Sequence, residues 1–211
     1  MNKKNLCHIV GAGEPSSAPP RPRPGDLLIA ADGGYEYTKA HGLTPDIVIG
    51  DFDSIHQIPD HPHLIRLNPI KDETDTLSAI RLGQERGYER FALYCGTGGR
   101  TDHTIANLQN LVMLARRGQR GWLIGQNEIF TAIHNGSIRF SAASKGFLSV
   151  FSMTDQSTGV CETGLKYQLR DAVLTHEYPV GVSNEFTGSE AEISVENGTL
   201  LIIYTMEAAE L

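Results

Sequence analysis

Short apolar runs alternate with helical patterns through the first half of this 211-residue chain. The runs are often β-branched and lack a polar face, which is typical of strands buried on both faces of a parallel sheet. They cover residues 6–10, 27–31, 46–50, 64–68 and 91–95. The helical patterns cover residues 35–42, 74–87 and 101–118. This alternation predicts an α/β fold with a doubly wound, mostly parallel sheet.

The longest helical pattern, residues 101–118, spaces its apolar residues three and four positions apart. These residues are Ile105, Leu108, Leu111, Val112 and Ala115. The spacing predicts one apolar stripe that faces the core, and Gly118 is expected to end the helix.

The pattern changes after about Trp122, where helical periodicity gives way to short strand-like runs. Turn signals are expected to separate these strands at Asn135-Gly136, Lys145-Gly146 and Asn197-Gly198. The change predicts two domains: an α/β domain over residues 1–122, and a smaller antiparallel sandwich or barrel over residues 123–211.

The composition narrows the possible partners and location. Lys and Arg number 18 against 25 Asp and Glu, and the resulting net charge of -7 argues against nucleic acid as a partner. Cys7, Cys95 and Cys161 are far apart and form no paired motif, which favours a reducing compartment over a disulfide framework or a zinc site. The basic, then apolar N-terminus is too short for a signal peptide, and no run approaches the roughly 18 apolar residues of a membrane span. We therefore expect a soluble, cytoplasmic protein without a membrane partner.

Acidic residues gather in four segments that follow predicted strands or precede predicted helices. The segments are Asp32-Gly33-Gly34, Gly50–Ser54, Lys71–Asp75 and Gly96–His103. In a doubly wound sheet the carboxyl ends of the strands open on one edge, where ligands bind. Each segment alone could equally cap a helix or start a turn.

Carboxylates that share one edge destabilise each other, because like charges at close range raise each other's pKa. A bound divalent cation would offset that cost. Oxygen ligands without histidine or cysteine favour magnesium over zinc, and magnesium leaves positions open for substrate phosphates. The four segments together therefore predict a magnesium and phosphate site.

The turn Gly96–Gly99 precedes a helix and is followed by Arg100. Its backbone N–H groups, the helix N-terminus and the guanidinium would all suit phosphate oxygens. The turn matches neither a P-loop nor a dinucleotide fingerprint, so both of those folds are disfavoured. His103 could cap the helix or take part in acid–base chemistry, and the sequence leaves both roles open.

These motifs, in this order, resemble those of the thiamin pyrophosphokinase family. The shared order is DGG, GDFDS, an acidic pair before a helix, and a G–GR–DH turn followed by Asn107. The matching segments of the second half are Thr163–Tyr167, Ser183–Glu185 and Gly198–Leu201. The resemblance implies an α/β domain, a C-terminal β-sandwich, and a homodimer with active sites between subunits. It also implies transfer of the diphosphate of ATP to the hydroxyethyl group of thiamin, giving AMP and thiamin diphosphate.

The resemblance also implies a role for each matching residue. Magnesium would be held by Asp32, Asp51, Asp53 and Asp75. Catalytic roles would fall to Asp51, Asp53, Asp75, Arg100 and Asp102. Nucleotide contacts would come from Asp32, Gly33, Gly34, Lys71, Thr74, Gly98, Gly99, Arg100, His103 and Asn107. Thiamin would be bound by Ser183 and Asn184.

Two positions depart from the family pattern. Glu162 stands where a small hydroxyl residue is more common, and Gln168 stands where proline is common. Both lie in the second half, so they affect recognition of the acceptor more than the phosphate chemistry.

Two other functions compete with this interpretation. The first is an aspartyl-phosphate phosphatase with Asp51 as nucleophile, although Ile55 stands where that chemistry usually has Thr or Val. The second is a non-catalytic sensor of nucleotide or thiamin. A sensor of polyphosphate would favour Arg and Lys over the many acidic residues of these segments.

Overall fold

The computed structural model describes residues 5–52, 58–68 and 73–208. The chain forms two compact units, one of residues 1–107 with 123–126 and one of residues 108–122 with 127–211. Helix α3 (Thr101–Arg116) and strand β6 (Arg120–Ile124) contribute residues to both units.

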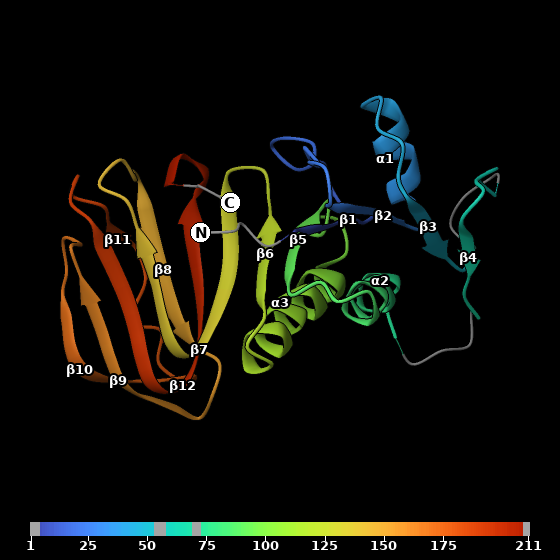
Figure 1. Ribbon diagram of the computed structural model, residues 1–211. Helices are drawn as coiled ribbons and strands as arrows, with labels where there is room; N and C mark the ends of the chain where they lie inside the picture. The colour runs from blue at the N-terminus through green and yellow to red at the C-terminus, as the bar shows by residue number, and fades with distance from the viewer. Residues whose placement is uncertain (1–4, 53–57, 69–72, 209–211) are drawn as a thin grey trace. The chain divides into compact units, whose positions relative to one another are not determined.

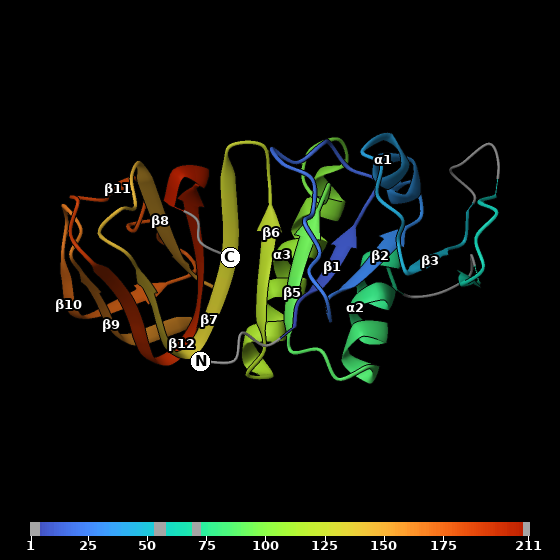
Figure 2. The ribbon, with the colours of Figure 1, turned by 45° about the horizontal axis from the view of Figure 1, so that its top comes forward.

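The first unit is built on a parallel sheet. Its strands lie in the order β5 (Arg90–Tyr94), β1 (Cys7–Val10), β2 (Leu27–Ala31), β3 (Ile47–Gly50) and β4 (Leu64–Arg66), and every neighbouring pair is parallel. Figure 2 shows β5, β1 and β2 pointing the same way. Helices α1 (Gly34–Ala40) and α2 (Asp75–Glu85) lie on opposite sides of this sheet (Figure 1). The predicted doubly wound α/β fold is confirmed.

The apolar runs form strands because the sheet is covered on both faces. Every residue of β1, β2 and β3 is buried. A strand in that position has no solvent face and therefore needs no polar alternation.

The second unit is antiparallel and centres on two long strands, β7 (Glu128–Phe140) and β12 (Ala191–Thr205). The first half of β12 pairs with β9 (Gln156–Thr163), and its second half pairs with β8 (Phe147–Ser152). Strand β10 (Leu169–Thr175) extends the β9 branch, and β11 (Asn184–Glu185) extends the β8 branch. A short helix, η1 (Met206–Ala208), follows β12. The antiparallel character predicted for the second half is confirmed.

Two of the three predicted turns are wrong. Asn135-Gly136 lies inside β7 and Asn197-Gly198 lies inside β12, and both strands continue past them. The two segments face each other at a register shift, where the Asn135 side chain accepts a hydrogen bond of 2.9 Å from the Gly198 amide. Asn135 (φ 45) and Gly198 (φ 130) both have positive φ. The residues that predicted turns therefore form an irregularity in the pairing of β7 with β12. Lys145-Gly146 does lie between β7 and β8.

The predicted apolar stripe of α3 is also partly wrong. Ile105 is 54% exposed, whereas Asn107 and Asn110 are buried together with Leu111. The Asn107 side chain donates a 2.8 Å hydrogen bond to the Gly96 carbonyl, which satisfies a polar group on the buried face. The helix ends at Arg116, just before Gly118, as predicted.

No helix in the described part of the chain is both long enough and apolar enough to span a membrane.

Candidate active site

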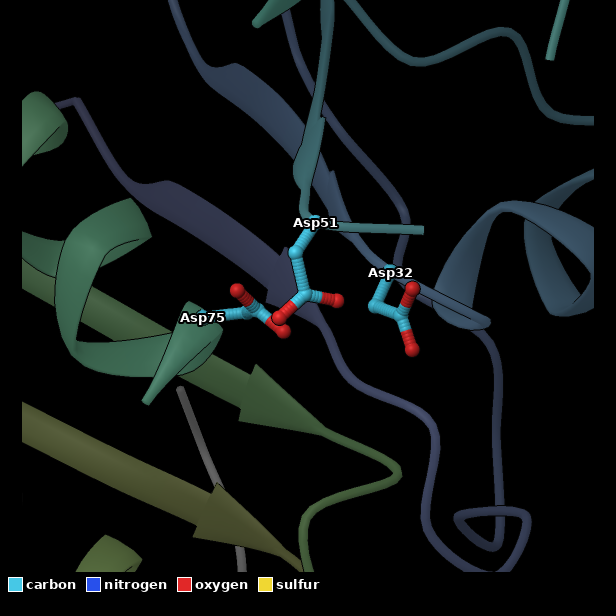
Figure 3. A group of neighbouring side chains, drawn as sticks. All are labelled: Asp32, Asp51 and Asp75. Carbon is cyan, nitrogen blue, oxygen red and sulfur yellow. The ribbon is translucent and has the colours of Figure 1, made fainter. Parts of the chain in front are cut away.

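Three carboxylates meet at the carboxyl edge of the parallel sheet. Asp32 directly follows β2, Asp51 directly follows β3, and Asp75 is the first residue of α2. Each offers one carboxylate oxygen, and these three oxygens all lie within 4.8 Å of one another. Figure 3 shows the side chains converging from three separate elements. The structure thus brings together three of the four predicted metal ligands, while the fourth, Asp53, lies outside the described residues.

Close backbone packing fixes Asp32. Its φ is 49 and its amide donates a 2.8 Å hydrogen bond to the Ile49 carbonyl. A Cβ on Gly50 would lie only 3.1 Å from the Asp32 Cα, so β3 can run beside Asp32 because Gly50 has no side chain. Asp32 is 9% exposed as a result.

The second glycine of the DGG motif has a steric role. Helix α1 begins at Gly34 with its backbone against the end of β1, and a Cβ there would collide with the Val10 carbonyl. Gly33 is the N-cap residue of α1. The motif therefore lets a helix begin directly behind Asp32.

Phe52 anchors the loop that carries Asp51. Its side chain is 5% exposed and packs in a core cluster with Ala30 and Val48, against which Tyr35 and Leu64 also pack. A large apolar side chain next to Asp51 thus fixes the point where the loop leaves β3, and with it the direction of the carboxylate.

Helix capping fixes Asp75. Thr74 is the N-cap of α2, and its hydroxyl oxygen accepts a 3.2 Å hydrogen bond from the Leu77 amide. Asp75 then stands in the first turn, where a negative charge interacts favourably with the helix dipole. Lys71, which was predicted to contact nucleotide from the same segment, lies outside the described residues.

The chemistry of the three carboxylates fits a hard divalent cation. All the donors are oxygens, and they come from the ends of two strands and the first residue of a helix. Like charges held this close destabilise the fold unless a cation neutralises them. Magnesium prefers such ligands and binds through few of them, which leaves room for phosphate oxygens.

The glycine turn ends β5 and leads into α3. Gly98 (φ 73) and Gly99 (φ 57) both adopt the left-handed conformation. Asn107, which is 4% exposed, holds the turn through its hydrogen bond to the Gly96 carbonyl. Asn107 therefore stabilises the conformation of the turn.

Arg100 and Asp102 form an ion pair at the surface beside this turn. The Arg100 Nη2 lies 2.7 Å from the Asp102 Oδ2, and both side chains are mostly exposed. The hydrogen bond from Arg100 holds the pKa of Asp102 below its ordinary value, with further support from the His103 amide at 3.0 Å. Asp102 is not part of the three-carboxylate group, and His103 is exposed.

Glu14 was not among the site residues predicted from the sequence. Its Oε1 accepts a 3.2 Å hydrogen bond from the Gly99 amide, inside the turn predicted to bind phosphate. Glu14 follows β1 by four residues, so the rule that ligands bind at strand carboxyl ends would have found it.

In the second unit, Asn184 is a buried hydrogen-bonding centre. It is 6% exposed, and its Nδ2 donates to the Glu162 Oε2 (2.8 Å) and to the Tyr167 carbonyl (2.6 Å). Its Oδ1 accepts from the amides of Tyr167 (3.0 Å) and Glu185 (2.9 Å). Two of these bonds tie the 164–167 loop to β11, one ties β9 to β11, and one lies within β11. Ser183 beside it is exposed, with φ 61.

Glu162, one of the two departures from the family pattern, is the buried partner of Asn184. It is 2% exposed, and burial raises the pKa of its carboxyl, against the opposing effect of the Asn184 hydrogen bond. Its Oε1 has no hydrogen-bond partner among the described residues. From the sequence Glu162 was noted only as a departure from the family pattern, and no local signal predicted that Asn184 would meet it.

Two family models match the chain. One describes the catalytic domain of thiamin pyrophosphokinase and matches residues 24–123, and the other describes the vitamin B1 binding domain of thiamin pyrophosphokinase and matches residues 137–200. The chain belongs to the thiamin pyrophosphokinase family. The catalytic-domain match spans the three carboxylates and the glycine turn, and the other match spans Glu162 and Asn184.

Individual members of the family are similar over most of their length. The chain is 26% identical to thiamine pyrophosphokinase of Bacillus subtilis (strain 168) over 184 residues, which is 84% of this chain and 86% of that protein. It is 23% identical to thiamin pyrophosphokinase 1 of Caenorhabditis elegans, over 75% of this chain and 70% of that protein.

Solved structures of the family share the fold. The crystal structure of thiamine pyrophosphokinase from Bacillus subtilis matches with a TM-score of 0.85 and 25% identity, covering 95% of this chain and 99% of that one. Thiamin pyrophosphokinase from Geobacillus thermodenitrificans matches with a TM-score of 0.81 and 23% identity, covering 98% of this chain and all of that one (100%).

Proposed function

We propose that the protein is a thiamin pyrophosphokinase that transfers the diphosphate of ATP to the hydroxyethyl group of thiamin and releases AMP. The observation that carries this proposal is the convergence of Asp32, Asp51 and Asp75 at the sheet edge, within the segment that the family's catalytic-domain model matches. In this proposal residues 1–122 perform the phosphate chemistry, and residues 123–211 recognise thiamin and form the dimer.

Asp32, Asp51 and Asp75 are the residues that would hold magnesium, together with Asp53. Bound there, the ion would neutralise phosphate oxygens and draw charge away from the phosphorus under attack. The carboxylates lie at strand ends and at the start of a helix, so they are in place before substrate binds. Such positioning lowers the activation barrier of the transfer.

The transfer step is a direct displacement. The thiamin hydroxyl oxygen forms a bond to the β-phosphorus, the bond between that phosphorus and the α–β bridging oxygen breaks, and AMP leaves. The backbone amides of Gly98 and Gly99 and the Arg100 guanidinium bind the phosphate chain, and Asn107 holds the turn in place. Such a site works by orientation and charge neutralisation.

Asp102 is poorly suited to be the base. Because Arg100 lowers its pKa, its carboxylate holds a proton weakly. We assign Asp102 the role of orienting Arg100, and the proton of the thiamin hydroxyl passes to solvent water. Gly33, Gly34, Lys71, Thr74 and His103 remain proposed contacts of the nucleotide, on the resemblance alone.

In the second unit, Ser183 is the proposed thiamin contact and Asn184 acts through its neighbours. The exposed hydroxyl residue is free to meet a ligand, whereas all four hydrogen-bonding positions of the Asn184 amide are occupied. Asn184 would thus position Ser183 and the 164–167 loop.

The second unit also exposes apolar side chains that suit a dimer contact. Between 49% and 71% of each is exposed, and they are Phe147, Tyr167, Val173, Tyr178, Val180 and Val182. Large apolar side chains left exposed on one domain are candidates for an interface. We propose a homodimer through this unit and a cytoplasmic location, in keeping with the three free cysteines.

The test is product analysis by chromatography after incubation with ATP, thiamin and magnesium. Equal amounts of AMP and thiamin diphosphate, lost when a chelator is added, are the expected result. The Asp51→Asn variant should lose at least about a hundredfold in turnover, the scale set by removal of one preorganised charge. It should keep its fold by circular dichroism.

Asp155→Asn is the matched control, because Asp155 lies in the second unit with a fully exposed side chain. It makes the same charge change and should leave turnover unaltered. Free phosphate with a trapped aspartyl-phosphate on Asp51 would favour the phosphatase. Binding of thiamin and ATP without any product would favour the sensor.

A further inference from the structure

Hydrogen bonds connect the segment that follows β1 to Cys95 and Thr97, where the glycine turn begins. The Gly13 amide donates to the Cys95 carbonyl at 2.7 Å, and the Glu14 amide donates to the Thr97 carbonyl at 2.9 Å. The Ser16 hydroxyl oxygen accepts from the Cys95 amide at 2.8 Å. The backbone of Glu14 is therefore fixed beside the turn, even though its side chain is exposed.

The Glu14 side chain occupies the space above the two left-handed glycines. Its Oε1 lies 3.2 Å from the Gly99 amide nitrogen and accepts its hydrogen bond. A Cβ on Gly98 would collide with the Glu14 carboxylate, so the side chain lies directly against the backbone of the turn. The Glu14 carboxylate oxygen accepts the Gly99 N–H at the position where a phosphate oxygen would accept it.

The polar groups of this turn are thus in contact with carboxylates of the chain itself. Glu14 accepts a hydrogen bond from the Gly99 amide, and Asp102 forms an ion pair with the Arg100 guanidinium. Glu14 is not part of the group formed by Asp32, Asp51 and Asp75. It adds negative charge at the point where the phosphate chain is expected.

We propose that Glu14 limits the affinity for ATP, because its carboxylate competes with the nucleotide's phosphate chain for the Gly99 amide. This inference rests on the proposed function only in taking the turn as the phosphate site. One N–H cannot donate fully to both acceptors, and a carboxylate left beside a triphosphate would repel it. The side chain must therefore swing away as the phosphate chain binds.

A bracing role for Glu14 predicts the opposite result. If the carboxylate mainly held the turn in shape, its removal would loosen the turn and weaken ATP binding. Competition predicts tighter binding, so the sign of the change decides between the two.

The test compares Glu14→Gln and Glu14→Ala with wild type. Calorimetry with magnesium and inorganic tripolyphosphate measures binding of the phosphate chain without any transfer. Both variants should bind about two- to fivefold more tightly, the range expected for one exposed charge. The KM for ATP should fall by the same factor with little change in kcat, and the difference should shrink at high salt.

Glu85→Gln is the charge-matched control, since Glu85 is exposed at the end of α2 opposite Asp75. It should bind tripolyphosphate like wild type. Equal or weaker binding by both Glu14 variants would overturn the inference, as would the absence of tripolyphosphate binding in every protein. Tighter binding by the variants, in a protein that makes no thiamin diphosphate, would uphold the inference while refuting the proposed function.

Discussion

Replacing Asn184 with alanine tests the hydrogen-bonded centre of the second unit. The Asn184→Ala variant loses four hydrogen bonds of 2.6 to 3.0 Å at a position that is 6% exposed. One of the four is the bond donated to the buried Glu162 carboxyl. The 164–167 loop keeps its Lys166 contacts with Glu185 but loses both bonds between Asn184 and Tyr167.

The magnitude follows from those four bonds. A net contribution of about 1 kcal/mol for each gives roughly 4 kcal/mol. Tyr167 is 61% exposed, so water can replace part of what its backbone groups lose. We therefore expect the free energy of unfolding to fall by about 2–4 kcal/mol, toward the upper end if Glu162 keeps its charge without a donor.

Urea unfolding followed by the fluorescence of Trp122 measures this change. Trp122 is the single tryptophan and belongs to the same unit as Asn184. With a urea dependence of about 2–3 kcal/mol per molar, the unfolding midpoint should fall by about 1 M. Asn197→Ala is the control, because Asn197 is exposed in the same unit and should shift stability by less than about 0.5 kcal/mol.

Equal midpoints for Asn184→Ala and Asn197→Ala would refute the reasoning. Kinetics gives a second measurement. If Asn184 positions the thiamin site, the KM for thiamin should rise in Asn184→Ala while the KM for ATP stays near that of wild type. An equal rise in both constants would contradict a role confined to the second unit.

Three further predictions concern single positions. Phe52→Ala should lower the free energy of unfolding by about 3 kcal/mol, as for other buried phenylalanines, and reduce turnover by releasing Asp51; unchanged thermal stability would contradict the anchoring role. Gly34→Ala should give insoluble or early-melting protein, because the added Cβ collides with the Val10 carbonyl; a normal melting curve would show that α1 can shift. Burial raises the pKa of Glu162 above its ordinary value of 4.5, so wild type should lose stability as pH rises from 4.5 through the folded-state pKa. Glu162→Gln cannot titrate, so urea unfolding at several pH values should show its stability gaining on that of wild type over this window, and parallel curves would exclude the effect.

Local sequence predicted the strands of the first unit well, because strands buried on both faces require continuous apolar runs. The apolar run at 27–31 matches β2 residue for residue. Placing carboxylates after such runs also predicted that Asp32 and Asp51 would meet, since parallel strands end on one edge.

Local signals were misleading where the partner strand or helix decided the outcome. An Asn-Gly pair usually closes a hairpin, yet Asn135-Gly136 lies in a continuous strand because β12 pairs with β7 on both sides of it. Helical spacing placed Ile105 on the buried face of α3, but the face that includes Asn107 is buried. The hydrogen bond to the Gly96 carbonyl offsets the cost of burying the Asn107 amide. The spacing of apolar residues carries no information about such a bond.

The sequence by itself determined the order of elements, the antiparallel second half, the acidic strand ends and the family motifs, because each is encoded within a few consecutive residues. Only the tertiary structure decided that Glu14 lies on Gly99, 85 residues away, and that Glu162 meets Asn184, 22 residues away. The physical reason is that a side chain's partner depends on how strands register and loops close. Contacts between residues so far apart in the chain are set by packing across the whole fold. No short stretch of sequence can predict them.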